Sequence, residues 1–365
     1  MKENPLLALK ALGQQVWLDN LSRALFRDGA LEGFVRDDGV DGVTSNPSIF
    51  RKAIADTADY ADDRQRLRRS DLTAEGRYEA IVIDDIRTAC NLLWPTYLAS
   101  GGEAGFVSLE VSPALSHDGA GTEAAARHLR LLVSRDNLLV KVPGTPAGIR
   151  AFEALTAAGI RVNVTLLFSQ PQYEAVAQAY LRGAQRWLES GGHPGRLRSV
   201  ASLFLSRIDT LVDWRLDAIA TGEALALRGR AGVALAKRCY SRYRELFHGP
   251  AFSTLAAAGV RPQKLLWAST GGKNPAYSDV LYVEALIGPE TITTLPDATL
   301  AAFRDHGRVG PTLMLGMDDA RIHIEALAAL GIKLDEAGET LQFDGLCLFS
   351  DAYAMLLESL GPRTA

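Results

Sequence analysis

A single lysine interrupts an apolar segment near the middle of the chain. Residues 138–143 read LLVKVP, which places Lys141 inside a run typical of a buried strand. A buried ammonium is costly unless it is paired, or unless it gives up its proton and acts as a nucleophile. The alternative without a catalytic role is a lysine at a strand end whose ammonium reaches solvent. This segment alone leaves both interpretations open.

The next predicted strand, residues 160–167, is also partly polar. Apolar and polar side chains alternate along it, with Val162, Val164 and Leu166 on one face and Asn163 and Thr165 on the other. A helical pattern separates the two strands, as the crossover of a parallel pair requires. We therefore expect Lys141, Asn163 and Thr165 to share one space. An amine beside an amide and a hydroxyl favours Schiff-base chemistry on a carbonyl compound.

Six further segments have the length and composition of strands, and helical patterns lie between nearly every pair. They are residues 15–20, 40–45, 106–111, 199–205, 264–269 and 291–295. This order predicts an α/β fold, a (β/α)8 TIM barrel with extra N- and C-terminal helices. We expect a single domain over residues 1–365, with 308–365 as a helical C-terminal extension. Residues 208–247 are expected to form one long helical segment.

In such a barrel, catalytic groups lie at the carboxyl ends of the strands. Polar residues stand at or near these ends in most of the predicted strands: Asp19, Asn46, Glu110, Lys141, Asn163, Thr165, Ser202 and Ser269. A lumen without a function would be filled by Val, Ile and Leu. The repetition of polar residues over many strands therefore predicts one common site.

The bulk composition is that of an ordinary soluble protein. The chain has 365 residues, of which 47% are hydrophobic and 22% are charged, with a net charge of −4. This charge gives no support for a nucleic-acid partner. The three cysteines are far apart, which favours reduced thiols in the cytoplasm. The absence of a signal peptide and of a long apolar run argues against a membrane protein.

The sequence lacks the patterns of two other kinds of site. The six histidines show no ligand spacing, so we expect no metal. The segment TGGKNP resembles a Walker loop, but Asn274 occupies the Ser/Thr position and Trp267 stands where the first glycine should be. The segment PGTPAG lacks the G-x-G-x-x-G pattern of dinucleotide sites. We expect no cofactor.

Taken in order, the strand ends and their flanks resemble the transaldolase family, class I aldolase-type barrels of the pentose phosphate pathway. The matching segments are WLDNLSR, GVTSNPSIF, VSLEVSPALS, VKVPGT, NVTLLFS, SLFLSRID and ASTGGKNP. The residues around the lysine and the chain length are similar to the longer bacterial subgroup. The resemblance implies sugar-phosphate substrates and cytoplasmic transfer of a dihydroxyacetone unit from sedoheptulose 7-phosphate or fructose 6-phosphate. The acceptors would be glyceraldehyde 3-phosphate or erythrose 4-phosphate. It leaves open whether the chain is a monomer or a homodimer.

The resemblance also implies catalytic roles for four residues. Lys141 matches the lysine that forms the Schiff base. Asp19 matches the acid/base that handles the C4 hydroxyl proton when the C3–C4 bond breaks or forms. Glu110 and Thr165 match the pair that moves protons, with a water, while the carbinolamine forms and loses water.

Six further residues are expected at the substrate. Asn46 and Asn163 match amides that hold hydroxyls of the dihydroxyacetone unit, and Ser202 and Arg207 match the phosphate site. Phe204 shares a strand face with Ser202 and is expected there too. Lys273 takes the place of a second phosphate-binding arginine found in the shorter enzymes, which keeps the charge and loses the bidentate geometry.

Two alternatives use the same scaffold. The first is a lyase that releases dihydroxyacetone instead of transferring it. A glutamate at position 110, rather than a glutamine or tyrosine, favours transfer by analogy. The second is a non-catalytic barrel that binds sugar phosphates. Such a protein is expected to have lost Lys141 or Asp19, and both are present.

Overall fold

The eight predicted strands form a closed barrel. The structure is a computed structural model that describes residues 4–361. The strands are β1 Gln14–Leu18, β2 Val40–Thr44, β3 Phe106–Glu110, β4 Leu138–Pro143, β5 Val162–Leu167, β6 Ser199–Phe204, β7 Lys264–Ala268 and β8 Thr291–Leu295. Each strand pairs in parallel with the next, and β8 closes on β1. The predicted (β/α)8 TIM barrel is confirmed.

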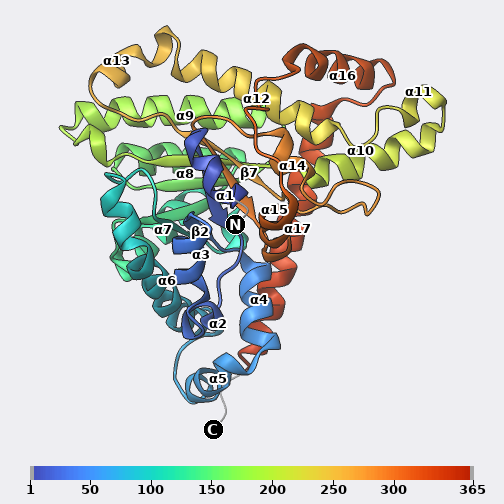
Figure 1. Ribbon diagram of the computed structural model, residues 1–365. Coiled ribbons are helices and arrows are strands. Elements are labelled where there is room, and N and C mark those ends of the chain that lie inside the picture. The colour runs from blue at the N-terminus through green and yellow to red at the C-terminus, as the bar shows by residue number, and fades with distance from the viewer. Residues whose placement is uncertain (1–3, 362–365) are drawn as a thin grey trace.

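Helices surround this barrel and connect its parallel strands (Figure 1). In chain order they are α1 Pro5–Ala11, α2 Arg23–Arg27, α3 Ala30–Asp37, α4 Pro47–Asp56, α5 Ala61–Arg68, α6 Ala74–Ala99, α7 Gly119–Val133, α8 Pro146–Ala157, α9 Gln170–Glu189, α10 Ser206–Ile219, α11 Gly222–Leu225, α12 Ala231–Phe247, α13 Ser253–Ala257, α14 Leu281–Ala285, α15 Asp297–His306, α16 Met317–Ala329 and α17 Leu334–Ser359. Short 3-10 turns lie at η1 Ala58–Tyr60, η2 Pro113–Leu115, η3 Pro194–Arg196 and η4 Pro250–Phe252. Within the described residues, no helix is long and apolar enough to cross a membrane.

The prediction of one long helical segment over residues 208–247 is wrong, because the chain forms three separate helices there, α10, α11 and α12. Ala220 ends α10 in the left-handed region at φ 57°, and Thr221 then caps α11. Gly229 makes a second break at φ 69°, where its amide donates to Asp213 Oδ1 at 2.8 Å. The alanine- and leucine-rich composition of this segment satisfies helical periodicity on both sides of each break, so it does not reveal them.

The alternation expected along β5 ends one residue early. Leu166 has φ 60°, and the pairing of β5 with β6 shifts register between Val164 and Leu167. The prediction that Leu166 shares a face with Val162 and Val164 is therefore wrong. Its side chain lies instead against α17, where a Cβ on Gly345 would be 3.1 Å from Leu166 Cδ2. Such a bulge re-aims the end of a strand, and here it lies beside the polar end of the barrel.

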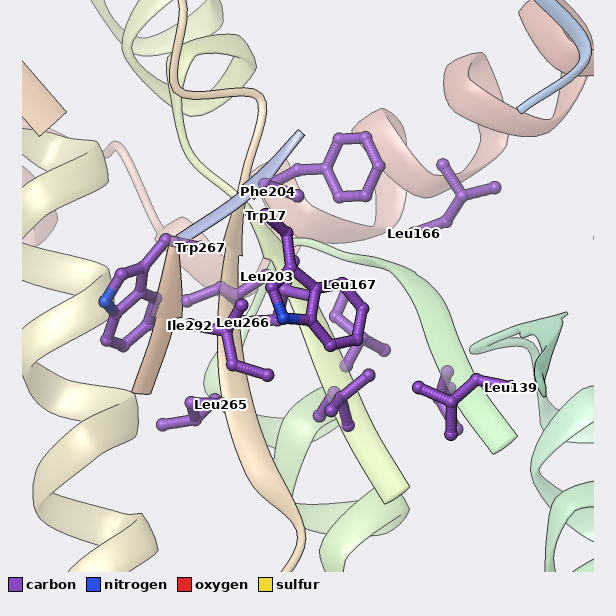
Figure 2. Close-up of a cluster of buried hydrophobic side chains, with 14 of the residues drawn as sticks. Trp17, Leu139, Leu166, Leu167, Leu203, Phe204, Leu265, Leu266, Trp267 and Ile292 are labelled. Atoms are coloured by element: carbon purple, nitrogen blue, oxygen red, sulfur yellow. The ribbon is translucent and has the colours of Figure 1, made fainter. Parts of the chain in front are cut away.

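The barrel lumen is filled in two layers. The lower layer is apolar and contains Trp17, Leu139, Leu266 and Ile292. Each of these residues comes two positions before a polar or small residue that faces the site, so it points into the lumen one level further from the carboxyl end. Trp17 packs over β2 at Gly42, where any Cβ would be 2.6 Å from the indole ring. Figure 2 shows these side chains among other buried residues of the strands, such as Leu203 and Leu265. The apolar layer, called the apolar floor below, therefore packs directly beneath the polar layer.

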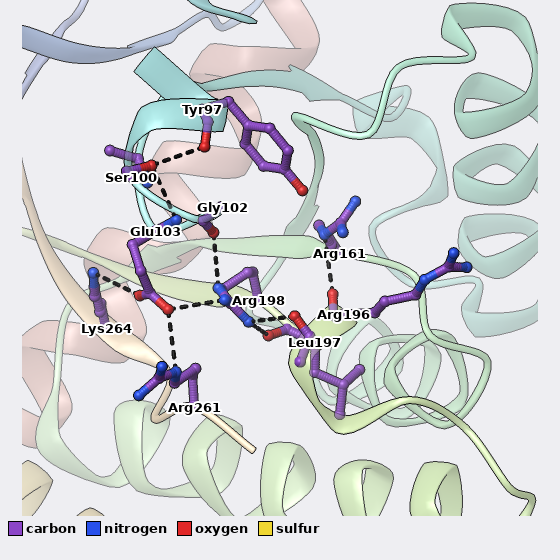
Figure 3. A network of polar contacts seen from close by, with 12 residues as sticks. Tyr97, Ser100, Gly102, Glu103, Arg161, Arg196, Leu197, Arg198, Arg261 and Lys264 are labelled. Carbon is purple, nitrogen blue, oxygen red and sulfur yellow. Dashed lines mark hydrogen bonds and ion pairs between the residues drawn. The ribbon is translucent and has the colours of Figure 1, made fainter. Parts of the chain in front are cut away.

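A polar network closes the opposite end of the barrel (Figure 3). Glu103, just before β3, forms ion pairs with Arg198 at 2.8 Å, Arg261 at 3.2 Å and Lys264 at 3.3 Å. Arg198 also donates to the carbonyl of Gly102 at 2.9 Å. These bonds tie together the segments that lead into β3, β6 and β7, so this end of the barrel serves stability.

The C-terminal region is helical, as expected for 308–365, of which residues 362–365 lie outside the described residues. Helix α16 packs on α12, while α17 contacts α4, α10 and β5 (Figure 1). The Gln342 amide on α17 donates to the carbonyls of Gly144 and Leu166, each at 3.0 Å. Helix α17 is therefore fastened to the carboxyl ends of β4 and β5.

We predict that His323 makes the protein less stable in acid. His323 on α16 is 4% exposed, and neither ring nitrogen has a hydrogen-bond partner in the described chain. Burial, with the charge of Arg230, lowers the pKa of His323 to about 4, whereas an unfolded histidine titrates near 6.5. The unfolded state thus binds the proton first, so the free energy of unfolding should fall by roughly 1–3 kcal/mol between these two pH values.

Urea unfolding across this pH range measures the effect. A His323→Leu variant should lose that part of the pH dependence, while His117→Leu, at an exposed position, should keep it. Equal slopes in wild type and His323→Leu would contradict the prediction.

Candidate active site

A cavity of about 180 Å³ opens at the carboxyl end of the barrel. Most of the residues expected at the site line it: Asp19, Asn46, Lys141, Thr165, Ser202, Phe204, Arg207 and Lys273. Glu110 and Asn163 do not line it, although both lie directly behind it. The structure therefore brings the predicted residues together: eight line the cavity, and Glu110 and Asn163 lie behind its wall.

Lys141 lies on β4 with its side chain in the lumen. Strand register puts Glu110, Lys141 and Asn163 side by side at one level of the barrel. The lysine is 4% exposed, and its Nζ donates to the carbonyl of Ser45 at 3.0 Å. The same Nζ is 3.7 Å from Glu110 Oε2. One carboxyl is therefore placed to take the proton that the amine must lose before it can attack a carbonyl.

Glu110 is poised to carry that proton. Burial raises the pKa of Glu110 to about 7, against the opposing charge of Lys141. Its Oε2, the oxygen 3.7 Å from Lys141 Nζ, is buried and has no closer hydrogen-bond partner among the described residues. A carboxyl that titrates near neutrality and has a free oxygen can both accept and return a proton during turnover.

The residues on β5 differ in what they can contact. The amide of Asn163 donates to Ser108 Oγ at 3.1 Å and accepts from Ser202 Oγ at 2.7 Å, which holds it beneath the cavity wall. Thr165 lines the cavity, and its Oγ1 is buried without a partner in the described chain. A buried hydroxyl without a partner is uncommon and is available to a ligand or a water.

Asp19 faces Lys141 from the other side of the lumen. It follows β1 directly, and its amide donates to the carbonyl of Leu295 at 2.8 Å. Burial raises the pKa of Asp19, while the positive charge of Lys141 opposes the shift. Asn46 lies nearby as the N-cap of α4, where its Oδ1 accepts from Ile49 at 3.0 Å. Its NH₂ group is thus the end left to bind a ligand.

The rim of the cavity carries two cations. Arg207, in the first turn of α10, lies with its guanidinium carbon 5.7 Å from the centre of the Phe204 ring. Burial lowers the pKa of Arg207, and Asp344 opposes that shift. Lys273 is exposed in the loop after β7. Between them, Ser269 has a left-handed backbone at φ 56° and a hydroxyl 2.8 Å from Ser206 Oγ, the kind of local strain that gathers at functional sites.

Sequence reasoning missed the contribution of the C-terminal region. Phe349 of α17 is 4% exposed and lines the cavity. A signal was present in the two glycines of this helix, Gly338 and Gly345, which are two turns apart and so share one face. A Cβ on Gly338 would be 2.7 Å from Ser169 Cβ, so the helix lies unusually close to the strand ends. Thr44, Ser48 and Thr294 are further lining residues that were not predicted.

The geometry as a whole suits a carbonyl compound with an anionic end. It combines a buried amine, a carboxyl that can take its proton, a second carboxyl in the same lumen and two cations at the rim. The model of the transaldolase/fructose-6-phosphate aldolase family matches residues 16–360. The chain belongs to this family.

Individual relatives in the transaldolase/fructose-6-phosphate aldolase family match almost the full chain. A protein named transaldolase from Thiobacillus denitrificans is 57% identical over 350 residues, which cover 96% of this chain and 98% of the relative. A transaldolase from Neisseria gonorrhoeae is 46% identical over 352 residues, with the same coverage of both chains. One from Mycobacterium marinum is 43% identical, covering 98% of this chain and 96% of the relative. The predicted family is confirmed, and the roles of single residues stay predictions.

We predict that iminium formation at Lys141 slows about tenfold for each pH unit below about pH 7. Below the raised pKa of Glu110, about 7, this carboxyl keeps its own proton and cannot take one from the neighbouring ammonium. Borohydride quenching of single turnovers with fructose 6-phosphate measures the rate. A Glu110→Gln variant cannot accept a proton at any pH, so it should be about 10²–10⁴-fold slower at neutral pH. A Glu110→Gln variant as fast as wild type at neutral pH would contradict the assignment.

Proposed function

We propose that this chain is a transaldolase that works through a Schiff base on Lys141. It moves a dihydroxyacetone unit from sedoheptulose 7-phosphate or fructose 6-phosphate to glyceraldehyde 3-phosphate or erythrose 4-phosphate. The observation that carries the proposal is the buried Lys141 Nζ, 3.7 Å from Glu110 Oε2 and facing the barrel cavity. The relatives named transaldolase support transfer over simple cleavage.

In the first half of the cycle, the neutral Lys141 amine adds to the C2 carbonyl carbon of the ketose. The nitrogen loses a proton and the former carbonyl oxygen gains one, which gives a carbinolamine. The C2–O bond then breaks and the hydroxyl leaves as water, with its proton supplied through Glu110 and the Thr165 hydroxyl. The resulting iminium is an electron sink, so the carbanion formed by C–C cleavage is stabilised without a metal ion.

In the second step Asp19 takes the proton of the C4 hydroxyl as the C3–C4 bond breaks. The electron pair of that bond moves into the iminium and gives an enamine, and the shorter aldose leaves. An acceptor aldehyde then adds to the enamine carbon while Asp19 returns its proton to the new hydroxyl. Water finally adds to C2, a proton moves from the added oxygen to the nitrogen, and the C2–N bond breaks, which releases the new ketose and restores the Lys141 amine. The amides of Asn46 and Asn163 and the hydroxyl of Ser202 are assigned to the sugar hydroxyls and phosphate.

The proposal extends to the protein as a whole. We treat residues 1–365 as one domain, because α17 supplies Phe349 to the cavity of the barrel. Sugar phosphates are its partners, and the cytoplasm is its expected location. The thiols of Cys90, Cys239 and Cys347 are free, which agrees with a reducing compartment.

Borohydride trapping with fructose 6-phosphate tests the Schiff base directly. Reduction should attach a three-carbon unit to the peptide that contains Lys141, and a Lys141→Ala variant should show neither labelling nor transfer. Lys264→Ala is the matched control, because this lysine lies on a barrel strand at the opposite end, paired with Glu103 at 3.3 Å. Transfer that persists in Lys141→Ala would overturn the mechanism.

The phosphate site gives an independent prediction. Removing a charge-assisted contact costs roughly 1.5–3 kcal/mol, so Arg207→Ala should raise KM for fructose 6-phosphate about ten- to a hundredfold. Unphosphorylated fructose should be affected much less. Lys273→Ala should show the same selectivity more weakly, because its ammonium makes a point contact. Equal losses for both sugars would mean that these residues support the fold instead.

A further inference from the structure

Glu110 separates two hollows of the molecule. On one side its carboxyl faces the Lys141 ammonium, which lines the cavity at the barrel mouth. On the other side Glu110 itself lines a second hollow of about 210 Å³ between the barrel and its outer helices. Neither Lys141 nor Thr165 lines this second hollow, and Glu110 does not line the first. The carboxyl is thus the partition between them.

The second hollow leads from Glu110 to the surface. Its walls come from α6, the turn η2, α7 and α17. Glu110 and Ser112 both line it, and the buried Ser112 Oγ has no partner within hydrogen-bond distance in the described chain. Its outer end includes the exposed Ala114 and the Glu79 carboxylate, whose side chain is 34% exposed. Polar atoms that lack protein partners beside an open hollow are positions where water binds.

Two tyrosines also contribute to the wall of this hollow. Tyr78 of α6 and Tyr353 of α17 both line the hollow, and their rings meet edge to face with centroids 5.3 Å apart. Burial raises the pKa of Tyr78, with further contributions from the charges of Tyr353, Glu110 and Glu79. The hydroxyl of Tyr78 is therefore kept neutral, as a group that can donate and accept hydrogen bonds along the hollow.

The chemistry of the cycle requires water at this position. Formation of the iminium at Lys141 releases one water from C2, and release of the product takes one up. Both events occur while a sugar phosphate fills the mouth cavity of about 180 Å³. Since Glu110 is assigned to protonate the oxygen that leaves C2, the released water forms beside that carboxyl, with the sugar between it and the mouth.

We propose that the hollow behind Glu110 is the route by which the water of the Schiff-base cycle exchanges with bulk solvent. Tyr78, Tyr353 and Ser112 are positioning residues that hold the water next to the carboxyl. Substrate and water thus enter from different sides of the barrel wall. This inference rests on the proposed Schiff-base function, and it assigns a purpose to a space that the sugar does not use.

The test blocks the hollow without touching the mouth. Ala125→Trp on α7 and Ala114→Trp on η2 each place an indole into it from a different wall. The matched control is Ala124→Trp, the exposed neighbour of Ala125, which does not line the hollow. Circular dichroism and thermal unfolding check that each variant is folded.

Exchange of the C2 oxygen is the measurement. Fructose 6-phosphate is incubated with each protein in ¹⁸O-labelled water without an acceptor, and the label at C2 is compared with the iminium trapped by borohydride. Both blocking variants should lower the label gained per trapped iminium at least about tenfold, with KM for the donor unchanged and the control like wild type.

Three results would overturn the inference. The first is unchanged exchange in both blocking variants, and the second is an equal loss in the Ala124→Trp control. The third is a rise in KM while exchange per iminium stays constant. A wild-type protein that forms no iminium would instead overturn the proposed function, so the two failures are distinguishable.

Discussion

The contact between the Lys141 ammonium and the Glu110 carboxyl, at 3.7 Å, lies where either charge alone would be expensive. The distance is longer than a good hydrogen bond, and the same Glu110 oxygen has no closer partner among the described residues. The pair is therefore not optimised for stability. This arrangement allows the proton to move from the Lys141 nitrogen to the Glu110 oxygen. The surrounding barrel must supply the free energy that keeps the two buried groups together.

That free energy comes from parts of the barrel that lie beneath the site or at its far end. The apolar floor around Trp17 and the ion pairs of Glu103 lie below the site and at the far end of the strands. Closure of the eight parallel strands fixes Glu110, Lys141 and Asn163 at one level through backbone pairing alone. The positions of these side chains therefore do not depend on interactions among themselves. Stability and chemistry are divided between the two ends of one sheet.

The barrel and most of the cavity could be predicted from the sequence because both follow local rules. A parallel strand that is buried on both faces is usually apolar, because burying a lysine or an asparagine costs free energy. Each polar residue in such a strand therefore indicates the site. Breaks at Ala220 and Leu166 could not be predicted, because non-glycine residues adopt a positive φ only when tertiary contacts hold them there. The position of Phe349 in the cavity could not be predicted either, because it depends on where α17 packs. Helical periodicity shows that a helix has an apolar face, but it does not show which part of the protein that face contacts. The separation of Glu110 from the mouth cavity likewise depends on the outer helices.

Helix α17 comes after all eight strands in the chain, yet it lines both hollows, through Phe349 and Tyr353. During synthesis on a ribosome, the strands therefore emerge before one wall of the cavity exists. A nascent barrel would hold Lys141 and Glu110 with that side open to solvent. The cavity around the Lys141 amine would then be closed only after α17 has docked. The order of the elements along the chain thus delays a competent catalyst until the final steps of folding.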